Sequence, residues 1–224
     1  MKNYIDLKIT PIIEHETENF NIKTCKKFSE AFFKRQSDEA GSYLHSLFSC
    51  IPHSLHLPFE AFYHSLLFSI FRSADVDVEP EVDKAKGIID LVIHSPDYGI
   101  MITEIKYAKS EVEINDNNKN NVKKITEKDR RQLDSSIMEA FKKILDQEYL
   151  SPYKGSDIPI YAVAIAVCGR SHVKIRSYPA GELLNNPSIY LADKNIGSSG
   201  DSPAKDISAK SSAPKRPRSQ KPLP

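Results

Sequence analysis

Cysteine is scarce in this sequence. The three cysteines, Cys25, Cys50 and Cys168, are odd in number and do not have the spacing of a metal-binding motif. This pattern excludes the disulfide framework of small secreted domains and fits a reducing cytosol.

Long apolar runs are absent as well. No stretch approaches the roughly 20 apolar residues that a membrane-spanning helix needs. The first residues also lack the uninterrupted apolar segment of a secretory signal. We therefore expect a cytoplasmic protein that has no membrane partner.

The chain has no marked excess of charge of one sign, because its formal net charge is +1 at pH 7. Six basic and two acidic residues fall in the stretch 197–224, which therefore carries +4 and leaves −3 on the remaining residues. An acidic body of this kind has to bind phosphates through local clusters or metal ions, and not through a global positive field.

The 224 residues are 40% hydrophobic and 27% charged, which is ordinary for a globular protein and sufficient for a real hydrophobic core. We expect one domain at residues 42–195, preceded by an N-terminal extension at 1–41. A Ser-, Pro- and Lys-rich tail at 196–224 is expected to be disordered.

Hydrophobic periodicity predicts an α/β order of elements. Helices are expected at 28–35, 42–51, from Pro58 onward, and 127–150. Strands are expected at 76–82, 87–94, 99–107, 158–168 and 173–178. The polar segment 108–126 between the third strand and the next helix is expected to form a long mobile loop.

The second and third of these strands carry the residues that suggest chemistry. Asp90 lies inside an otherwise apolar run, and Glu104 and Lys106 alternate onto one face of the following strand. Two carboxylates that face each other in a half-buried sheet repel unless a divalent cation lies between them. Carboxylate oxygens suit Mg²⁺ or Mn²⁺, and a nearby ammonium can orient an attacking water.

An Asp on one strand and Glu-x-Lys on the next resembles the PD-(D/E)XK nuclease superfamily. The likeness extends from about Leu44 to Pro179. Further matching points are Ile51-Pro52-His53, the helix segment 60–67, Glu81 and Gly87. These points resemble a bacterial branch that is usually found as the C-terminal domain of AAA-ATPase-like proteins.

The resemblance implies a restriction-endonuclease-like αβββαβ core with a mixed central sheet flanked by helices. It also implies a Mg²⁺- or Mn²⁺-dependent nuclease acting on nucleic acid, with DNA as the expected substrate. Asp90 and Glu104 would hold the metal, and the Ile105 carbonyl would be a further ligand. Lys106 would assist the reaction, and Glu60 and Glu81 would complete the acidic cluster.

Other positions leave alternatives open. Gln132 matches a Gln that related nucleases direct toward the active site from the helix after the loop. The Tyr that often follows it is missing at 135–138. His64 stands one turn after Glu60 and is either a packing residue or a phosphate contact. His53 and His56 are expected to have loop or core roles and not to bind metal.

Two basic segments are weaker indications of function. The basic residues around the loop either form a phosphate-binding patch or are solvated surface residues. They are Lys109, Lys123, Lys124, Arg130 and Arg131. The tail segment 214–218 resembles a nuclear-localisation signal and is also consistent with a solubilising tail.

The leading hypothesis is therefore a metal-dependent nuclease, with a protein partner as a possible source of specificity. The alternative is a nuclease-like module that binds nucleic acid or a protein without cutting, including a bacterial effector that acts in a host nucleus. The sequence does not distinguish DNA from RNA, endo- from exonucleolytic cleavage, or one metal ion from two.

Overall fold

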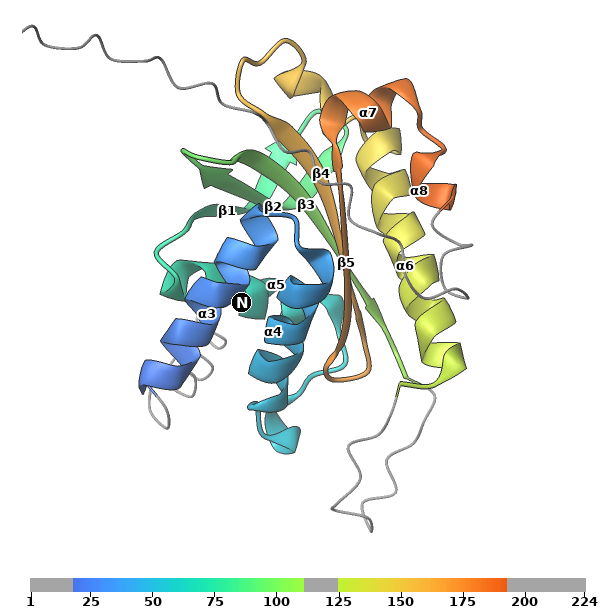
Figure 1. Cartoon of the computed structure of the whole chain (residues 1–224). Coiled ribbons are helices and arrows are strands. Elements are labelled where there is room, and N and C mark those ends of the chain that lie inside the picture. Colours follow the sequence, from blue (N-terminus) through green and yellow to red (C-terminus); the bar gives the residue numbers. More distant parts are fainter. Residues whose placement is uncertain (1–17, 111–124, 193–224) are drawn as a thin grey trace, which may run out of the picture.

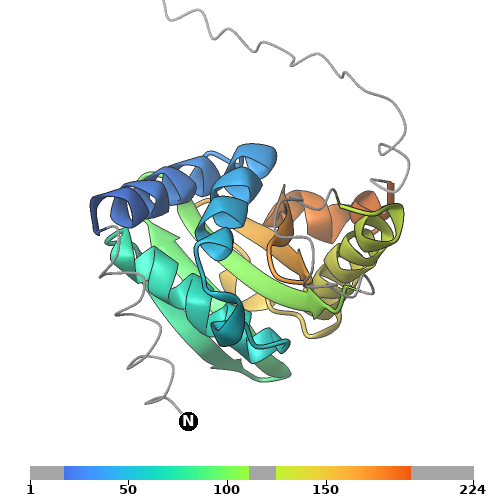
Figure 2. The same ribbon diagram turned by 90° about the horizontal axis from the view of Figure 1, so that it is seen from below.

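The computed structural model describes residues 18–110 and 125–192, which form three layers. A central β-sheet has helices α3, α4 and α5 on one face and α6, α7 and α8 on the other (Figures 1 and 2). This arrangement places β3, which carries Glu104 and Lys106, between α5 on one face and α6 on the other.

The first face is covered by the three N-terminal helices, which run over Glu18–Phe33 (α3), Ser37–Ser49 (α4) and Glu60–Ser73 (α5), with a short 3₁₀ turn at His53–Leu55. Helix α3 starts ten residues before the predicted position 28. Helix α5 starts at Glu60 and not at Pro58, because Phe59 is still extended with φ −134° and ψ 150°.

The sheet has five strands in the order β1-β2-β3-β4-β5. They span Asp77–Lys84 (β1), Gly87–Ser95 (β2), Gly99–Ala108 (β3), Ile160–Cys168 (β4) and His172–Pro179 (β5). β3 and β4 are parallel, whereas all other neighbours are antiparallel. The sheet is therefore mixed, as expected.

Helix α6, Glu127–Asp146, makes the crossover that parallel pairing of β3 and β4 requires. Its start is defined by a capping box in which the Thr126 hydroxyl accepts from the Asp129 amide and the Asp129 carboxylate accepts from the Thr126 amide. A short 3₁₀ turn at Ser151–Tyr153 follows, and helices α7 (Ala180–Asn185) and α8 (Ile189–Ala192) close the same face.

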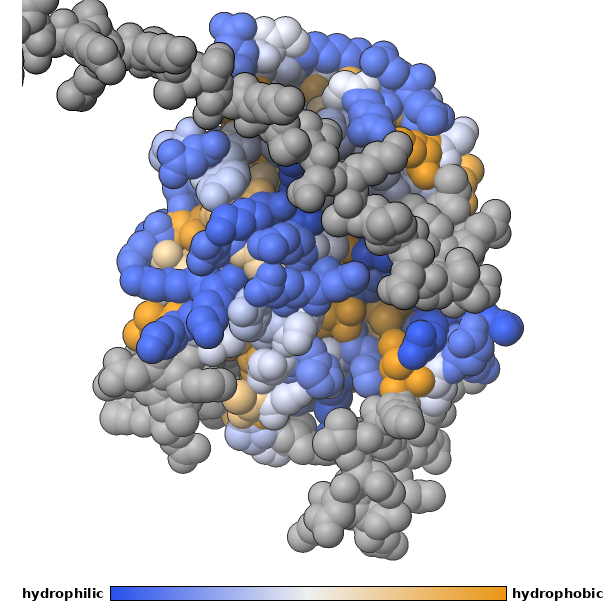
Figure 3. Space-filling model, viewed as in Figure 1, coloured by the Kyte–Doolittle hydropathy of each residue, from blue (hydrophilic) through white to orange (hydrophobic). Residues whose placement is uncertain are grey.

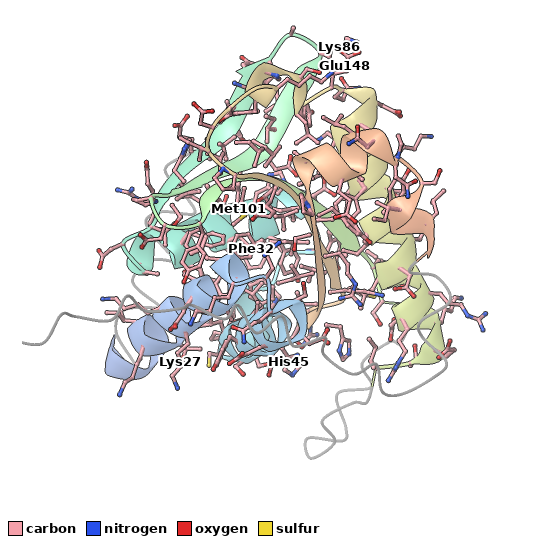
Figure 4. The ribbon with its side chains drawn as sticks, turned by 45° about the horizontal axis from the view of Figure 1, so that its top comes forward. Lys27, Phe32, His45, Lys86, Met101 and Glu148 are labelled. Carbon is pink, nitrogen blue, oxygen red and sulfur yellow. The ribbon has the colours of Figure 1, made fainter. Side chains whose placement is uncertain are left out.

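Two apolar cores lie on the two sides of the sheet. One contains Phe28 and Phe32 of α3, Leu91 and Ile93 of β2, and Ile105 of β3. Figure 4 shows Phe32 and Met101 in this interior, whereas Lys27 of α3 points away from it. The outward surface of α3 and α4 is mainly hydrophilic (Figure 3). Residues 18–41, assigned from the sequence to an extension, thus contribute to the same core as the sheet.

The second core packs α6 against the sheet and contains Val92, Ile102, Phe141 and Ile144. β4 contributes to both cores, with every residue from Ala162 to Cys168 buried, as its apolar sequence predicts. The α/β class and the helix-flanked mixed sheet are confirmed, while α7 and α8 were not predicted. Across the two described ranges, no helix is both long and apolar enough to span a membrane.

Candidate active site

The candidate site lies where β2 and β3 separate. Their ladder runs from Ser95 opposite Gly99 to Leu91 opposite Thr103, and Asp90 is the next residue of β2. Beyond the ladder, the Asp90 carboxylate enters the gap and its Oδ2 accepts a hydrogen bond of 2.7 Å from the Ile105 amide. The Asp90 carboxylate therefore accepts the hydrogen bond that a backbone carbonyl of β2 would accept in a continuous ladder, and this contact fixes it in the sheet.

Glu104 and Lys106 project from β3 onto the face that α6 covers. Their β4 neighbours in the ladder are Ala164 and Ala166, whose small side chains leave room for charged groups. Glu104 is fully buried, and the Lys106 ammonium lies 2.9 Å from its Oε1. The alternation expected from the sequence thus brings these two charges together.

Helix α5 adds two side chains from the other face of the sheet. Glu60, in its first turn, accepts from the Lys106 ammonium at 3.0 Å and from the Tyr107 amide at 3.3 Å. One turn later, His64 Nε2 lies 3.0 Å from Asp90 Oδ2. The predicted spacing of Glu60 and His64 therefore positions both residues on the site, with His64 orienting Asp90.

Lys143 enters from α6 between the two carboxylates. Its Nζ lies 2.6 Å from Glu104 Oε1 and 3.5 Å from Asp90 Oδ1. Tyr149, which follows α6, places its ring centroid 6.0 Å from the same nitrogen and donates from its hydroxyl to the Ile88 carbonyl at 2.7 Å. Lys143 thus bridges the two acids that the sequence analysis assigned to a metal.

The two carboxylates differ in acidity because their surroundings differ. Burial, and then the negative charge of Asp90, raise the pKa of Glu104 to about 7, although both lysines act in the opposite direction. Burial alone would raise the pKa of Asp90, but His64, the Ile105 amide and Lys143 together lower it. Asp90 is therefore an anion at neutral pH, and Glu104 is the weaker acid of the two.

Both lysines remain cationic. Burial favours their neutral forms, but the adjacent carboxylates outweigh it and raise the pKa of Lys106 and of Lys143. Lys106 is held by Glu104 and Glu60, and Lys143 by Glu104 and Asp90. Neither ammonium can therefore act as a general base near neutral pH.

The residues of the cluster fit a divalent cation. Both lysines lie within ion-pair distance of Glu104 Oε1, but both carboxylate oxygens of Glu104 are buried and neither has a hydrogen-bond partner among the described residues. A buried carboxylate oxygen without a partner is costly, and a hard cation relieves that cost. Within residues 18–110 and 125–192, however, no three side chains of His, Cys, Asp or Glu form a ready metal cage. A cation here would rely on the two carboxylates and on backbone oxygen.

The predicted residues differ in their relation to this cluster. Asp90, Glu104, Lys106 and Glu60 come together, and the Ile105 amide contacts Asp90. Glu81 is exposed on β1, and none of the described contacts of the cluster involves it. It has a left-handed φ of 52° and interrupts the β1–β2 ladder opposite Asp90.

Gln132 lies elsewhere on α6. Its side-chain oxygen accepts a hydrogen bond from Cys168 at 3.3 Å, near the end of β4. Position 143 is eleven residues further along, which corresponds to about 16 Å of helix. The side chain of α6 that reaches the carboxylates is therefore Lys143 and not Gln132.

Lys143 and Tyr149 were missed in the sequence analysis. A usable signal existed for Lys143, because it lies seven and three residues after the buried Ser136 and Ala140 and so on the sheet-facing stripe of α6. The tyrosine expected at 135–138 is absent there, but Tyr149 stands beside the cluster. That Tyr149 lies beside the cluster follows only from the register of α6 against the sheet.

The remaining candidates lie away from the cluster or outside the described residues. His56 contacts the Phe48 carbonyl at 3.2 Å, consistent with a loop role. Arg131 is exposed and pairs with Glu127 at 3.7 Å. Lys123, Lys124, the tail motif 214–218, and most of the expected mobile loop and tail lie outside the described residues.

Comparison with known proteins identifies a protein family. A family model described as the PD-(D/E)XK nuclease superfamily matches residues 58–177, which is more than half of the chain. The matched segment begins just before Glu60 and includes Asp90, Glu104, Lys106 and Lys143. No curated protein and no solved structure matches the chain.

Proposed function

Because the chain belongs to the PD-(D/E)XK nuclease superfamily, we propose that it is a divalent-metal-dependent nuclease that hydrolyses phosphodiester bonds in DNA. The observation that carries the proposal is the convergence of Asp90, Glu104 and Lys106 in one buried cluster at the β2–β3 fork. Within the superfamily, we place the chain in the branch associated with AAA-ATPase-like proteins, on the sequence points given above.

In this proposal, Asp90 and Glu104 hold Mg²⁺ or Mn²⁺, and the Ile105 carbonyl is a further ligand. When bound, the ion supplies Lewis-acid stabilisation of negative charge on the phosphate. Glu60 and Glu81 add negative charge around the site. Gln132, at the other end of α6, would contact substrate and not metal.

Neighbouring groups hold Asp90 and Lys106 in place. The Ile105 amide and His64 orient the Asp90 carboxylate, and Glu60 holds the Lys106 ammonium. Because Lys106 stays protonated, its part is electrostatic: it stabilises charge that develops on the phosphate and orients the attacking water. The burial of Glu104 strengthens these interactions by excluding solvent.

The test is digestion of circular and linear DNA, and of RNA, with added Mg²⁺. Asp90→Asn, Glu104→Gln and Lys106→Met are each expected to lower the cleavage rate about 100-fold or more. Asp97→Asn, Glu182→Gln and Lys142→Met are matched controls at exposed positions and should cleave like the wild type. Cleavage that survives all three site substitutions would refute the mechanism.

A second candidate function is a nuclease-like module that binds nucleic acid or a protein without cutting. It is favoured by one observation, which is that two ammonium groups already surround Glu104. Titration calorimetry with Mn²⁺ separates the two candidates, because a wild-type protein that binds no metal favours the second.

A further inference from the structure

Lys143 has a position that the nuclease proposal does not use. Its ammonium is within ion-pair distance of both Asp90 and Glu104, whereas Lys106 contacts Glu104 and Glu60. A cation that is shared by two carboxylates must lie between them. Lys143 therefore occupies the same place between the acids that a divalent ion would take.

The charges of the cluster show what Lys143 does there. With all groups ionised, three carboxylates (Asp90, Glu104 and Glu60) and two ammoniums (Lys106 and Lys143) leave one net negative charge. Without Lys143 the same cluster would carry two. The tethered ammonium therefore compensates the buried acids and weakens the attraction of the site for a second cation.

Lys143 is also the lysine that can leave. Its side chain is 34% exposed, compared with 18% for Lys106, and it contacts carboxylates on one side and the Tyr149 ring on the other. Lys106 in addition is held from α5 by Glu60. The hydroxyl of Tyr149 is anchored on β2, so the ring offers a fixed apolar and π surface beside the ammonium.

We propose that Lys143 is an internal counter-ion that competes with the divalent metal for Asp90 and Glu104 and must be displaced when metal binds. This inference rests on the proposed function only for the identity of the metal ligands. It predicts that removing the charge at position 143 tightens metal binding and, at the same time, destabilises the metal-free protein.

The experiment is calorimetric titration of Mn²⁺ into the full chain without nucleic acid. Lys143→Gln, which keeps a hydrogen-bond donor, is expected to bind Mn²⁺ about tenfold more tightly than the wild type, since a partly exposed like charge is removed. Lys143→Arg keeps the charge and should leave the affinity at the wild-type value. Lys142→Gln, the exposed neighbour on α6, is the matched control and should also leave it unchanged.

Thermal melts in a chelator supply the second measurement. Metal-free Lys143→Gln should melt at a lower temperature than Lys142→Gln, and saturating Mn²⁺ should raise its melting temperature more than that of the wild type. Lys143→Met provides the same comparison if Lys143→Gln does not fold. Addition of Asp90→Asn to Lys143→Gln should abolish the gain in affinity.

The competition is overturned if Lys143→Gln and Lys143→Met bind Mn²⁺ no more tightly than the wild type, or if none of the proteins binds it. This outcome is distinct from failure of the nuclease proposal. If Lys143→Gln binds Mn²⁺ more tightly but no cleavage is found, the counter-ion proposal is supported and the nuclease proposal is refuted. If Mn²⁺ binding is unchanged but cleavage depends on Asp90, the nuclease proposal is supported and the counter-ion proposal is refuted.

Discussion

At the scale of single residues, the site is held by groups that the metal would not touch. Asp90 is oriented from two directions, by the Ile105 amide within the sheet and by His64 from α5. Groups that orient a metal ligand typically affect metal affinity or activity 10- to about 100-fold. The orientation of the Asp90 carboxylate therefore depends in part on α5, through a histidine that would not itself bind the metal.

Replacement of His64 tests this dependence. His64→Ala removes the contact with Asp90 Oδ2 and is expected to lower the cleavage rate and the Mn²⁺ affinity by about 10- to 100-fold. The rate is measured with the best substrate from the digestion series, and the affinity by calorimetry. Ser65→Ala, next to it on α5, removes a hydroxyl that donates to the Ala61 carbonyl of the same helix and serves as control. Equal values for both variants would contradict a positioning role.

The sequence predicted the site residues on β2 and β3 better than the residues that α6 places around them. Alternation along β3 correctly placed Glu104 and Lys106 on one face, because a two-residue period needs no tertiary information. Lys143 follows the buried stripe of α6, but its place beside the acids, like that of Tyr149, depends on the register of α6 against β3, which packing decides. Gln132 was proposed from the family resemblance and lies about three turns of α6 before Lys143.

At the scale of elements, the fork depends on the turn between β2 and β3. Gly99 pairs with Ser95 and has φ 98°, in the left-handed region that favours glycine. A Cβ at this position would lie 2.0 Å from the carbonyl oxygen of Pro159, which directly precedes β4 and accepts from the Ile100 amide of β3. The hairpin and the parallel strand are therefore joined at one glycine.

Gly99→Ala should destabilise the protein strongly, because it introduces backbone strain and forces β4 away from β3. We expect a loss of about 3 kcal/mol in the free energy of unfolding, measured by urea denaturation. Gly155→Ala is the comparison, since Gly155 also has a positive φ, 81°, but open space around its Cβ. Its expected loss is about 1 kcal/mol, from strain alone. Similar losses for the two variants would show that the close approach is unimportant.

Element types were more predictable than element ends. The strands were found to within two residues at every end, because turn residues bound them. The starts of α3 and of α4, which begins at Ser37 and not at 42, were missed, as were the two short helices α7 and α8. Short helices are stabilised mainly by tertiary packing and not by their own propensity, so their sequences carry little signal.

At the scale of the whole molecule, two groups with shifted pKa values, His172 and Glu104, make the stability depend on pH. His172 of β5 stacks near His45 of α4, with ring centroids 6.1 Å apart. Burial, and then His45, lower the pKa of His172 below its usual 6.5 despite the opposing charge of Asp129. On the other face, the pKa of Glu104 is raised from 4.5 to about 7. These groups act on stability in opposite directions.

The signs follow from proton binding in the two states. Below about pH 6.5 the unfolded chain protonates His172 more readily than the folded protein does, so His172 makes stability fall as the pH falls. The folded protein binds a proton at Glu104 more readily than the unfolded chain, so Glu104 makes metal-free stability fall as the pH rises through about 7.

Comparison of the wild type with His172→Gln isolates the first effect. Between about pH 7.5 and 5.5, the wild type should lose more free energy of unfolding than His172→Gln, because the variant lacks the group that resists protonation. Urea denaturation in chelator at several pH values measures the difference. Parallel curves for the two proteins would contradict the assignment.

The parallel pairing of β3 with β4 also determines when the site can exist during protein synthesis. Asp90 emerges from the ribosome 53 residues before Lys143, and β4 follows later still. A nascent chain that ends before Lys143 lacks the ammonium that bridges the two acids, and one that ends before β4 lacks the strand that pairs with β3 beside Glu104. We therefore expect the proposed metal site to be absent until translation passes residue 168, and ribosome-arrested chains of increasing length, assayed for metal binding, would test this timing.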